Sequence, residues 1–103
     1  MPIKKEYSQN NDECKVTFIL PKDITENFHT ISVLGDFNLW DQHINQFCKN
    51  EADGTCTATV ILEPQKKYQF RYLADGVHWF NEGDADEEVD SYYKGFRNSV
   101  IVV

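Results

Sequence analysis

The sequence predicts an all-β protein, built as an antiparallel β-sandwich of about seven strands. Three observations support this fold class. Short runs rich in β-branched and aromatic residues recur along the 103 residues. Turn residues interrupt these runs roughly every ten residues, as in small sandwiches. No segment shows the length and the 3.6-residue period of a helix.

The first half of the chain contains two expected strands. CKVTFIL, residues 14–20, alternates apolar and polar side chains, and Pro21 ends the strand because proline cannot donate to a ladder. ISVLGDF begins with a β-branched run, and Gly35 near its end indicates a bulge or a close approach of another backbone. The next stretch, DFNLWDQHINQ, has no regular pattern, so we expect Trp40 on a loop.

The second half contains two Asp-Gly turns, Asp53-Gly54 and Asp75-Gly76, which are strong hairpin signals between β-forming runs. The expected strands are TCTATVIL, KYQFRYLA, VHWF and the terminal NSVIVV. The second of these runs alternates, which predicts one aromatic face for the core (Tyr68, Phe70, Tyr72). Arg71 then lies on the opposite, outward face.

The order of these elements favours one immunoglobulin-like sandwich domain over residues 14–103. Residues 1–13 are polar and aperiodic, so we expect a flexible N-terminal tail. No apolar run approaches the roughly 18–20 residues of a membrane helix, and the N-terminus does not resemble a secretory signal. We therefore expect a cytoplasmic monomer.

The charge of −7 is concentrated in one place. Seventeen acids face ten bases, and six of the acids lie between residues 82 and 90 without an intervening base. We expect a solvated acidic loop there; a weak calcium site and a carboxylate pair for glycoside hydrolysis are the alternatives. Neither this loop nor the nearly neutral remainder has a basic face, which argues against nucleic acid and membrane partners.

The sequence contains no recognisable motif for catalysis, cofactor binding or metal binding. The three cysteines are Cys14, Cys48 and Cys56, an odd number without a CxxC pair, so we expect free thiols, partly buried. The common phosphate-binding, zinc-protease and serine-hydrolase motifs are missing. We therefore expect no enzyme activity, with no catalytic residues, no metal ligands and no cofactor.

Two tryptophans remain as candidate binding groups. Trp40 and Trp79 each follow a turn signal. Such a tryptophan is either buried in the core or exposed as a flat platform on which the apolar face of a pyranose can stack. Arg71 faces outward, and Asn98 begins the last expected strand. Both side chains can bind sugar hydroxyls.

VLGDFNLW, YQFRYLADGVHW and GFRNSVIVV, in this order, resemble carbohydrate-binding module family 48. The family comprises early-set domains ahead of isoamylases and glycogen branching enzymes, and the glycogen-binding domain of the AMP-activated protein kinase beta subunit. The resemblance covers residues 14–103. It implies an early-set immunoglobulin-like fold that binds α-1,4-glucans such as glycogen, starch or maltooligosaccharides.

Carried over to this chain, the resemblance makes Trp40 and Trp79 the stacking platforms, and Arg71 and Asn98 the polar contacts. Three features depart from the kinase-type domain. One extra residue precedes Trp79 in VHW, and the segment from residue 82 to residue 90 is unusually acidic. The third concerns the residues around Gly95, where Lys94 and Phe96 stand in place of leucine and threonine. Phe96 is expected to supply apolar area.

The leading expectation is a noncatalytic α-glucan-binding module, acting alone or beside a separate glucan-active enzyme. The alternative is a regulatory or protein-interaction early-set domain that has lost sugar binding. A glycoside hydrolase, or an accessory domain of one, is the third hypothesis.

Overall fold

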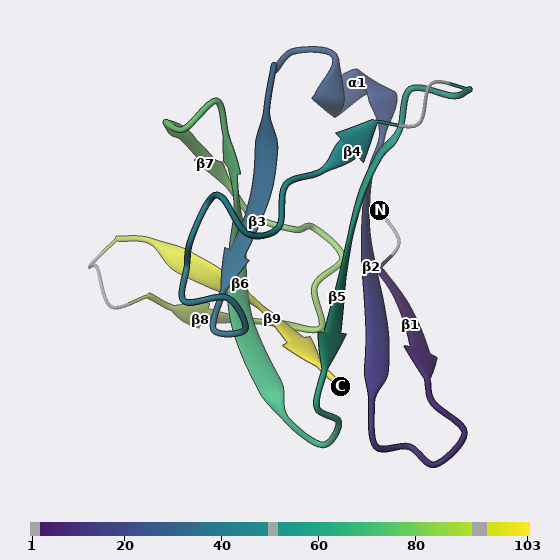
Figure 1. The fold of residues 1–103 in the computed structure, drawn as a ribbon. Coiled ribbons are helices and arrows are strands. Elements are labelled where there is room, and N and C mark those ends of the chain that lie inside the picture. Colours follow the sequence, from purple (N-terminus) through teal and green to yellow (C-terminus); the bar gives the residue numbers. More distant parts are fainter. Residues whose placement is uncertain (1–2, 50–51, 92–94) are drawn as a thin grey trace.

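Two antiparallel sheets pack face to face in the computed structural model, which describes residues 3–49, 52–91 and 95–103 (Figure 1). The first sheet has the order β1-β2-β5-β4, with bounds Ile3–Tyr7, Cys14–Leu20, Cys56–Leu62 and Cys48–Lys49. The second has the order β3-β6-β9-β8, with bounds Ile31–Gly35, Lys67–Ala74, Arg97–Val102 and Glu87–Asp90. A further strand, β7 (His78–Phe80), pairs with β6. The predicted all-β antiparallel sandwich is confirmed.

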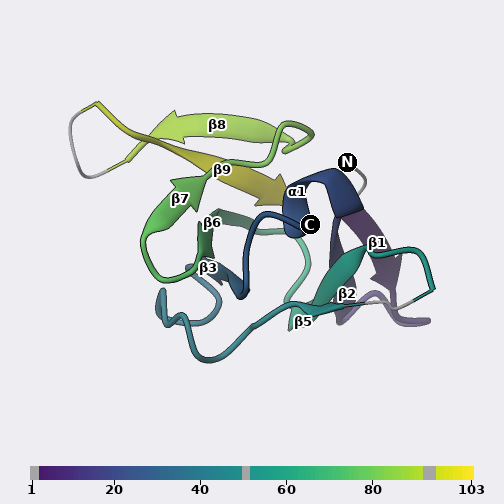
Figure 2. The same ribbon diagram turned by 90° about the horizontal axis from the view of Figure 1, so that it is seen from above.

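The strand order also agrees with the immunoglobulin-like arrangement. In the constant-type domain the first, second, fifth and fourth strands form one sheet, and the third shares the other sheet with the last two. Here β1-β2-β5-β4 reproduces the first sheet and β3-β6-β9 the second. Two additional strands follow β6 in the chain: β7 pairs with β6, and β8 pairs with β9 at the edge of the sheet. Viewed from above, the two layers are separate (Figure 2).

The core lies between the two sheets and is rich in aromatic rings. Phe18 of β2 contacts Phe70 and Tyr72 of β6, with ring centroids 5.1 and 6.3 Å apart. Tyr68 packs against the edge of this cluster, so the aromatic face predicted for β6 is confirmed. Arg71 lies on the other face of the same strand, because successive side chains of a strand alternate.

The three cysteines are free thiols, as predicted. Cys14 and Cys56 are buried as small core side chains, whereas Cys48 is exposed. Burial raises the pKa of the Cys14 thiol. The only helix in the described residues, α1 (Lys22–Thr25), is a single turn. No helix of that part of the chain is long and apolar enough to cross a membrane.

The flexible tail expected over residues 1–13 is wrong for its first part. Ile3–Tyr7 forms β1, which pairs with β2 from Ile3↔Phe18 to Tyr7↔Cys14. The sequence IKKEY does not predict a strand, because β1 is an edge strand whose side chains are mostly exposed and do not alternate between apolar and polar. Lys5 ties it to the second sheet, since its Nζ lies 2.8 Å from the Asp86 carboxylate and from the carbonyl oxygen of Val102.

The solvated loop expected at residues 82–90 is wrong in part: five of its six acids are exposed, but its second half is a strand and Glu82 is buried. Glu87–Asp90 forms β8, which pairs with β9, and Glu87 makes a 2.8 Å ion pair with Lys67. Glu82 is only 3 % exposed. The excess of negative charge is therefore partly compensated by ion pairs and partly buried.

Candidate functional site

The outward face of the second sheet carries most of the candidate residues. Gln69, Arg71 and Leu73 point outward from β6. Trp79 of β7 lies directly opposite Leu73, and directly opposed residues of an antiparallel pair share a face. On β9, Asn98 lies on this face as well, since its neighbour Ser99 pairs with the core residue Phe70.

A tightly bonded loop after β3 carries Trp40. The buried Asn38 side chain organises this loop: its Oδ1 accepts from the Gly35 N–H, and its Nδ2 donates to the Val33 carbonyl and to Asn45 Oδ1. Gly35 is required because a Cβ there would lie 2.6 Å from the Gln69 carbonyl oxygen. The close approach predicted at Gly35 is thus confirmed, as is the loop position of Trp40.

Trp40 itself has a left-handed backbone, with φ of 57°, which is uncommon for a bulky residue. Its N–H donates to the Gly35 carbonyl at 3.1 Å. The indole Nε1–H donates to Asp36 Oδ1 at 3.2 Å. The ring is therefore held both at its backbone and at its polar edge, while the side chain stays half-buried.

Trp79 is presented by the β6–β7 hairpin, whose turn includes Asp75 and Gly76, both with positive φ. Asp75 Oδ1 accepts from the N–H groups of Thr30 and His29, at 2.9 and 2.8 Å, and so ties the hairpin to the start of β3. These bonds, led by that from Thr30, lower the pKa of Asp75. Trp79 is 45 % exposed.

Both tryptophans line one open surface depression of about 420 Å³. Its other lining residues are Leu34, Asp41, Gln42, His43, Leu73 and Gly76. Leu34 and Leu73 are buried although they lie on the outward face of the sheet. The depression therefore combines an apolar floor with two aromatic rings and polar loop side chains.

Arg71 lies beside Trp79 and Phe96. Its guanidinium carbon is 5.4 Å from the centre of the Trp79 ring and 5.8 Å from that of Phe96, within cation–π range. Its Nε donates to Asn81 Oδ1 at 2.9 Å, and Asn81 Nδ2 donates to the Arg97 carbonyl. Partial burial lowers the pKa of Arg71, although an arginine remains protonated at neutral pH.

Asn98 is buried, with 8 % of its surface exposed, whereas a side chain that contacts a ligand freely would be more accessible. Its Nδ2 donates to Gln69 Oε1 at 3.0 Å, so the amide has an intramolecular partner. Phe96 is exposed beside Arg71. Lys94, the remaining candidate, lies outside the described residues.

Sequence reasoning missed three polar residues that hold the candidates in place. Asp36 bonds Trp40, Asn81 bonds Arg71, and Gln69 bonds Asn98. Gln69 could have been found from the alternation of β6, because it lies two residues before Arg71 on the same face. The bond from Trp40 to Asp36 spans only four residues, but it lies in a loop without a regular pattern. The bond from Arg71 to Asn81 joins β6 to the residue that follows β7, which no local pattern reveals.

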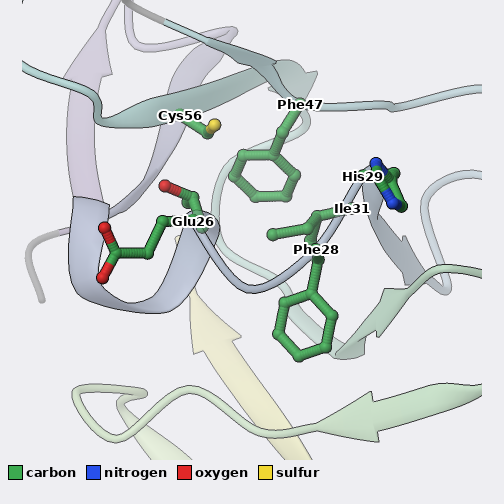
Figure 3. Close-up of a pocket in the computed structure, with 7 residues that line it drawn as sticks. Glu26, Phe28, His29, Ile31, Phe47 and Cys56 are labelled. Carbon is green, nitrogen blue, oxygen red and sulfur yellow. The ribbon is translucent and has the colours of Figure 1, made fainter.

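A second pocket, of about 340 Å³, lies between α1 and strands of both sheets (Figure 3). It is lined by Thr25, Glu26, Phe28, His29, Ile31, Phe47 and Cys56. The Glu26 carboxylate points away from the Phe47 ring, and Phe28, Ile31 and Phe47 supply the apolar part of the lining (Figure 3). The depression beside the tryptophans is the more open of the two and is lined by both tryptophan rings, which favours it as the sugar site.

Glu82, the buried acid of the segment from residue 82 to residue 90, is not a free carboxylate. Glu82 Oε1 accepts from the Tyr72 hydroxyl at 2.8 Å, and Oε2 accepts from the Asp84 N–H at 2.9 Å. Burial raises the pKa of Glu82, and burial together with the nearby Glu82 raises that of Tyr72. This carboxylate therefore serves the interior of the sandwich rather than a cleft.

The fold and the outward face define an immunoglobulin-like β-sandwich with an aromatic surface depression. No known family model matches the chain. No curated protein matches it either.

Proposed function

We propose that this protein is a noncatalytic module that binds a neutral α-glucan, such as glycogen, starch or a maltooligosaccharide, in the depression beside Trp40 and Trp79. The observation that carries the proposal is the convergence of these two rings. They are 39 residues apart in the sequence, yet they line the same open depression. The apolar faces of successive glucose units stack on aromatic rings.

Polar groups beside the rings support the same ligand. Arg71 is held against Trp79 by its contact with the ring and by Asn81, so its terminal nitrogens need little reordering to meet a hydroxyl. The guanidinium lies over the Trp79 ring, and 45 % of the Trp79 surface stays exposed for contact with a glucose unit. The motifs that resemble carbohydrate-binding module family 48 point to the same class of ligand.

The size of the site sets the expected affinity. A sugar that covers half of an aromatic side chain removes roughly 100 Å² from water, which contributes on the order of 2–3 kcal/mol for each ring. A few hydrogen bonds add about 1 kcal/mol each, and association entropy offsets much of the sum. We expect a dissociation constant of roughly 10 µM to 1 mM.

The protein-interaction alternative predicts that a basic partner docks on the acidic segment. The pairing of Asp86 with Lys5, the pairing of Glu87 with Lys67 and the burial of Glu82 all reduce the charge available to such a partner. The sugar proposal is therefore favoured. A hydrolase would instead release reducing ends from amylose, in an activity lost on substitution of one carboxylate.

The test is an NMR titration of the ¹⁵N-labelled protein with β-cyclodextrin and maltoheptaose, following the two indole N–H signals. We expect both signals to shift, and both titration curves to give the same dissociation constant, within the range given above. Cellopentaose, a β-linked glucan, is the control and should leave both signals in place. If neither signal moves at several millimolar maltoheptaose, the proposal is wrong and the protein-interaction alternative replaces it.

A further inference from the structure

The Asp36 carboxylate joins the loop of Trp40 to the central strand of the second sheet. Its Oδ1 accepts from Trp40 Nε1 at 3.2 Å, and its Oδ2 accepts from the Gln69 N–H at 2.8 Å. The Asp36 N–H in turn donates to the Gln69 carbonyl at 3.0 Å. Asp36 therefore continues the β3–β6 pairing by one residue and presents its second carboxylate oxygen to the indole.

The same strand position carries a second connection. The side chain of Gln69 accepts from Asn98 Nδ2 at 3.0 Å, on the neighbouring strand β9. A run of three hydrogen bonds thus links Trp40, Asp36, Gln69 and Asn98 across the outward face. Two residues expected to meet the sugar are fixed relative to each other by two residues that the sequence did not single out.

The ring of Trp40 needs such an anchor. Its left-handed backbone belongs to an exposed turn, in which the preceding Leu39 is also left-handed and is 89 % exposed. Trp40 is not part of the buried core. A directional bond from the ring edge to a carboxylate therefore restricts the rotamer of a side chain that packing alone holds weakly.

We propose that Asp36 is a positioning residue of the glucan site, which holds the Trp40 ring in the orientation that stacks on sugar. This inference rests on the proposed function. Preorganisation of the ring removes an ordering cost from binding, because the rotamer is already selected in the free protein. Loss of one such bond should weaken glucan binding roughly three- to tenfold.

The first measurement uses no sugar. In wild-type protein, the Trp40 indole proton should exchange with solvent more slowly than that of Trp79, whose Nε1 has no acceptor in the described part of the chain. Asp36→Ala should shift the Trp40 signal and speed its exchange, while the Trp79 signal serves as an internal reference. Asp53→Ala is the matched control, because Asp53 also accepts two hydrogen bonds in a turn, but in the other sheet.

The second measurement is a double-mutant cycle on maltoheptaose affinity. Trp40→Phe keeps an aromatic ring but removes the Nε1–H donor. Asp36→Ala should weaken binding three- to tenfold in the wild-type background and less than twofold in the Trp40→Phe background. If Asp36→Ala unfolds, Asp36→Asn replaces it, since an asparagine oxygen can accept from only one of the two donors well.

An unchanged Trp40 signal in Asp36→Ala, or an equal loss of affinity in both backgrounds, would overturn the inference. These results are distinct from failure of the proposed function, which appears as a wild-type protein that binds no glucan. In that case the positioning role in sugar binding falls as well, while the exchange rates still decide whether Asp36 holds the ring.

Discussion

Trp40 and Trp79 line the same depression, but the chain holds them in different ways. Trp40 lies on a loop, with a left-handed backbone and its indole bonded to Asp36. Trp79 belongs to β7, opposite Leu73 in the β6–β7 ladder, with the guanidinium of Arg71 against its ring. One ring is fixed by a few directional bonds, and the other by strand register and a cation.

This difference shows how a sheet and a loop can build one site. Register is determined along a whole strand pair, so the position of Trp79 depends on the integrity of β6 and its hairpin. The position of Trp40 depends on Gly35, Asp36 and Asn38, which lie within five residues of it. Local substitutions should therefore disturb one ring without the other.

The largest effect is expected when both rings are removed. The double variant Trp40→Ala/Trp79→Ala should bind maltoheptaose at least roughly 100-fold more weakly, since each ring contributes on the order of 2 kcal/mol. Its circular dichroism spectrum should match that of the wild type, because neither ring belongs to the buried core. Isothermal titration calorimetry measures the loss.

Tyr7→Ala is the control for this variant. It removes a 47 % exposed aromatic side chain from the first sheet and should leave the affinity unchanged. An unfolded double variant would assign both tryptophans to the stability of the fold instead.

Gly35→Ala should disturb the Trp40 side of the comparison. The new Cβ would lie 2.6 Å from the Gln69 carbonyl oxygen and 2.9 Å from Phe70 Cβ, so the end of β3 must shift. We expect a loss of about 1–3 kcal/mol in the free energy of unfolding, measured in urea. The Trp40 indole signal should move further than that of Trp79.

Gly83→Ala is the matched control, because no described atom beyond the adjacent residues lies within 4 Å of the position of its Cβ. Its stability and both indole signals should stay close to wild type. Equal destabilisation by the two alanines would contradict the close packing that we assign to Gly35.

Arg71→Lys should disturb the Trp79 side. Lysine keeps the charge but loses the planar group that lies against the ring and the Nε–H bond to Asn81. We expect glucan affinity to fall roughly two- to fivefold, in line with a cation–π contact of about 0.5–1 kcal/mol. Trp79 should show the larger indole shift, and a larger shift at Trp40 would count against this assignment.

The smallest expected effect is a pH dependence of the Trp79 hairpin. The pKa of Asp75 is lowered by the bonds from Thr30 and His29. Its stabilising contribution is therefore fully present above the unfolded pKa of about 3.9, and is lost as pH falls through the lower folded value. Urea unfolding between pH 2 and 6 should show that the free energy of unfolding falls as the pH is lowered. The part of this fall that Asp75 causes should be absent in Asp75→Asn.

The pH dependence of stability expected from Glu82 is opposite in sign to that expected from Asp75. Burial raises its pKa, so its contribution is fully present below the unfolded pKa of about 4.3 and is lost as pH rises through the raised folded value. The wild type should therefore lose stability relative to Glu82→Gln as pH rises above about 4.3. If the free energy of unfolding changes with pH equally in both proteins, the pKa of Glu82 is not raised by burial.

Most of the sheet structure could be predicted because its signals are local. The alternation of β6 correctly separates Phe70 and Tyr72 from Arg71, and the Asp75-Gly76 turn correctly locates the β6–β7 hairpin. β1 and β8 were missed since both are exposed edge strands whose charged residues lack the apolar alternation of a half-buried strand.

The candidate site was predictable only in part. Trp40, Trp79 and Arg71 are set apart by residue type and position, and the structure brings the two rings together in one depression. The bonds from Gln69 to Asp36 and from Asn98 to Gln69 join residues that are 33 and 29 positions apart, and the bond from Arg71 to Asn81 spans the β6–β7 hairpin. The burial of Glu82 was missed for a similar reason, because Glu82 lies in the connection after β7 and its partner Tyr72 lies on β6.

The loop that carries Trp40 has a second consequence, for self-association. After the turn it runs back along β3, where the Val33 N–H donates to the Asn45 carbonyl and the Phe47 N–H donates to the Ile31 carbonyl. An open strand edge is a template for pairing with another chain. By occupying the outer hydrogen-bonding groups of β3, the loop prevents the sheet from growing through this edge into an aggregate.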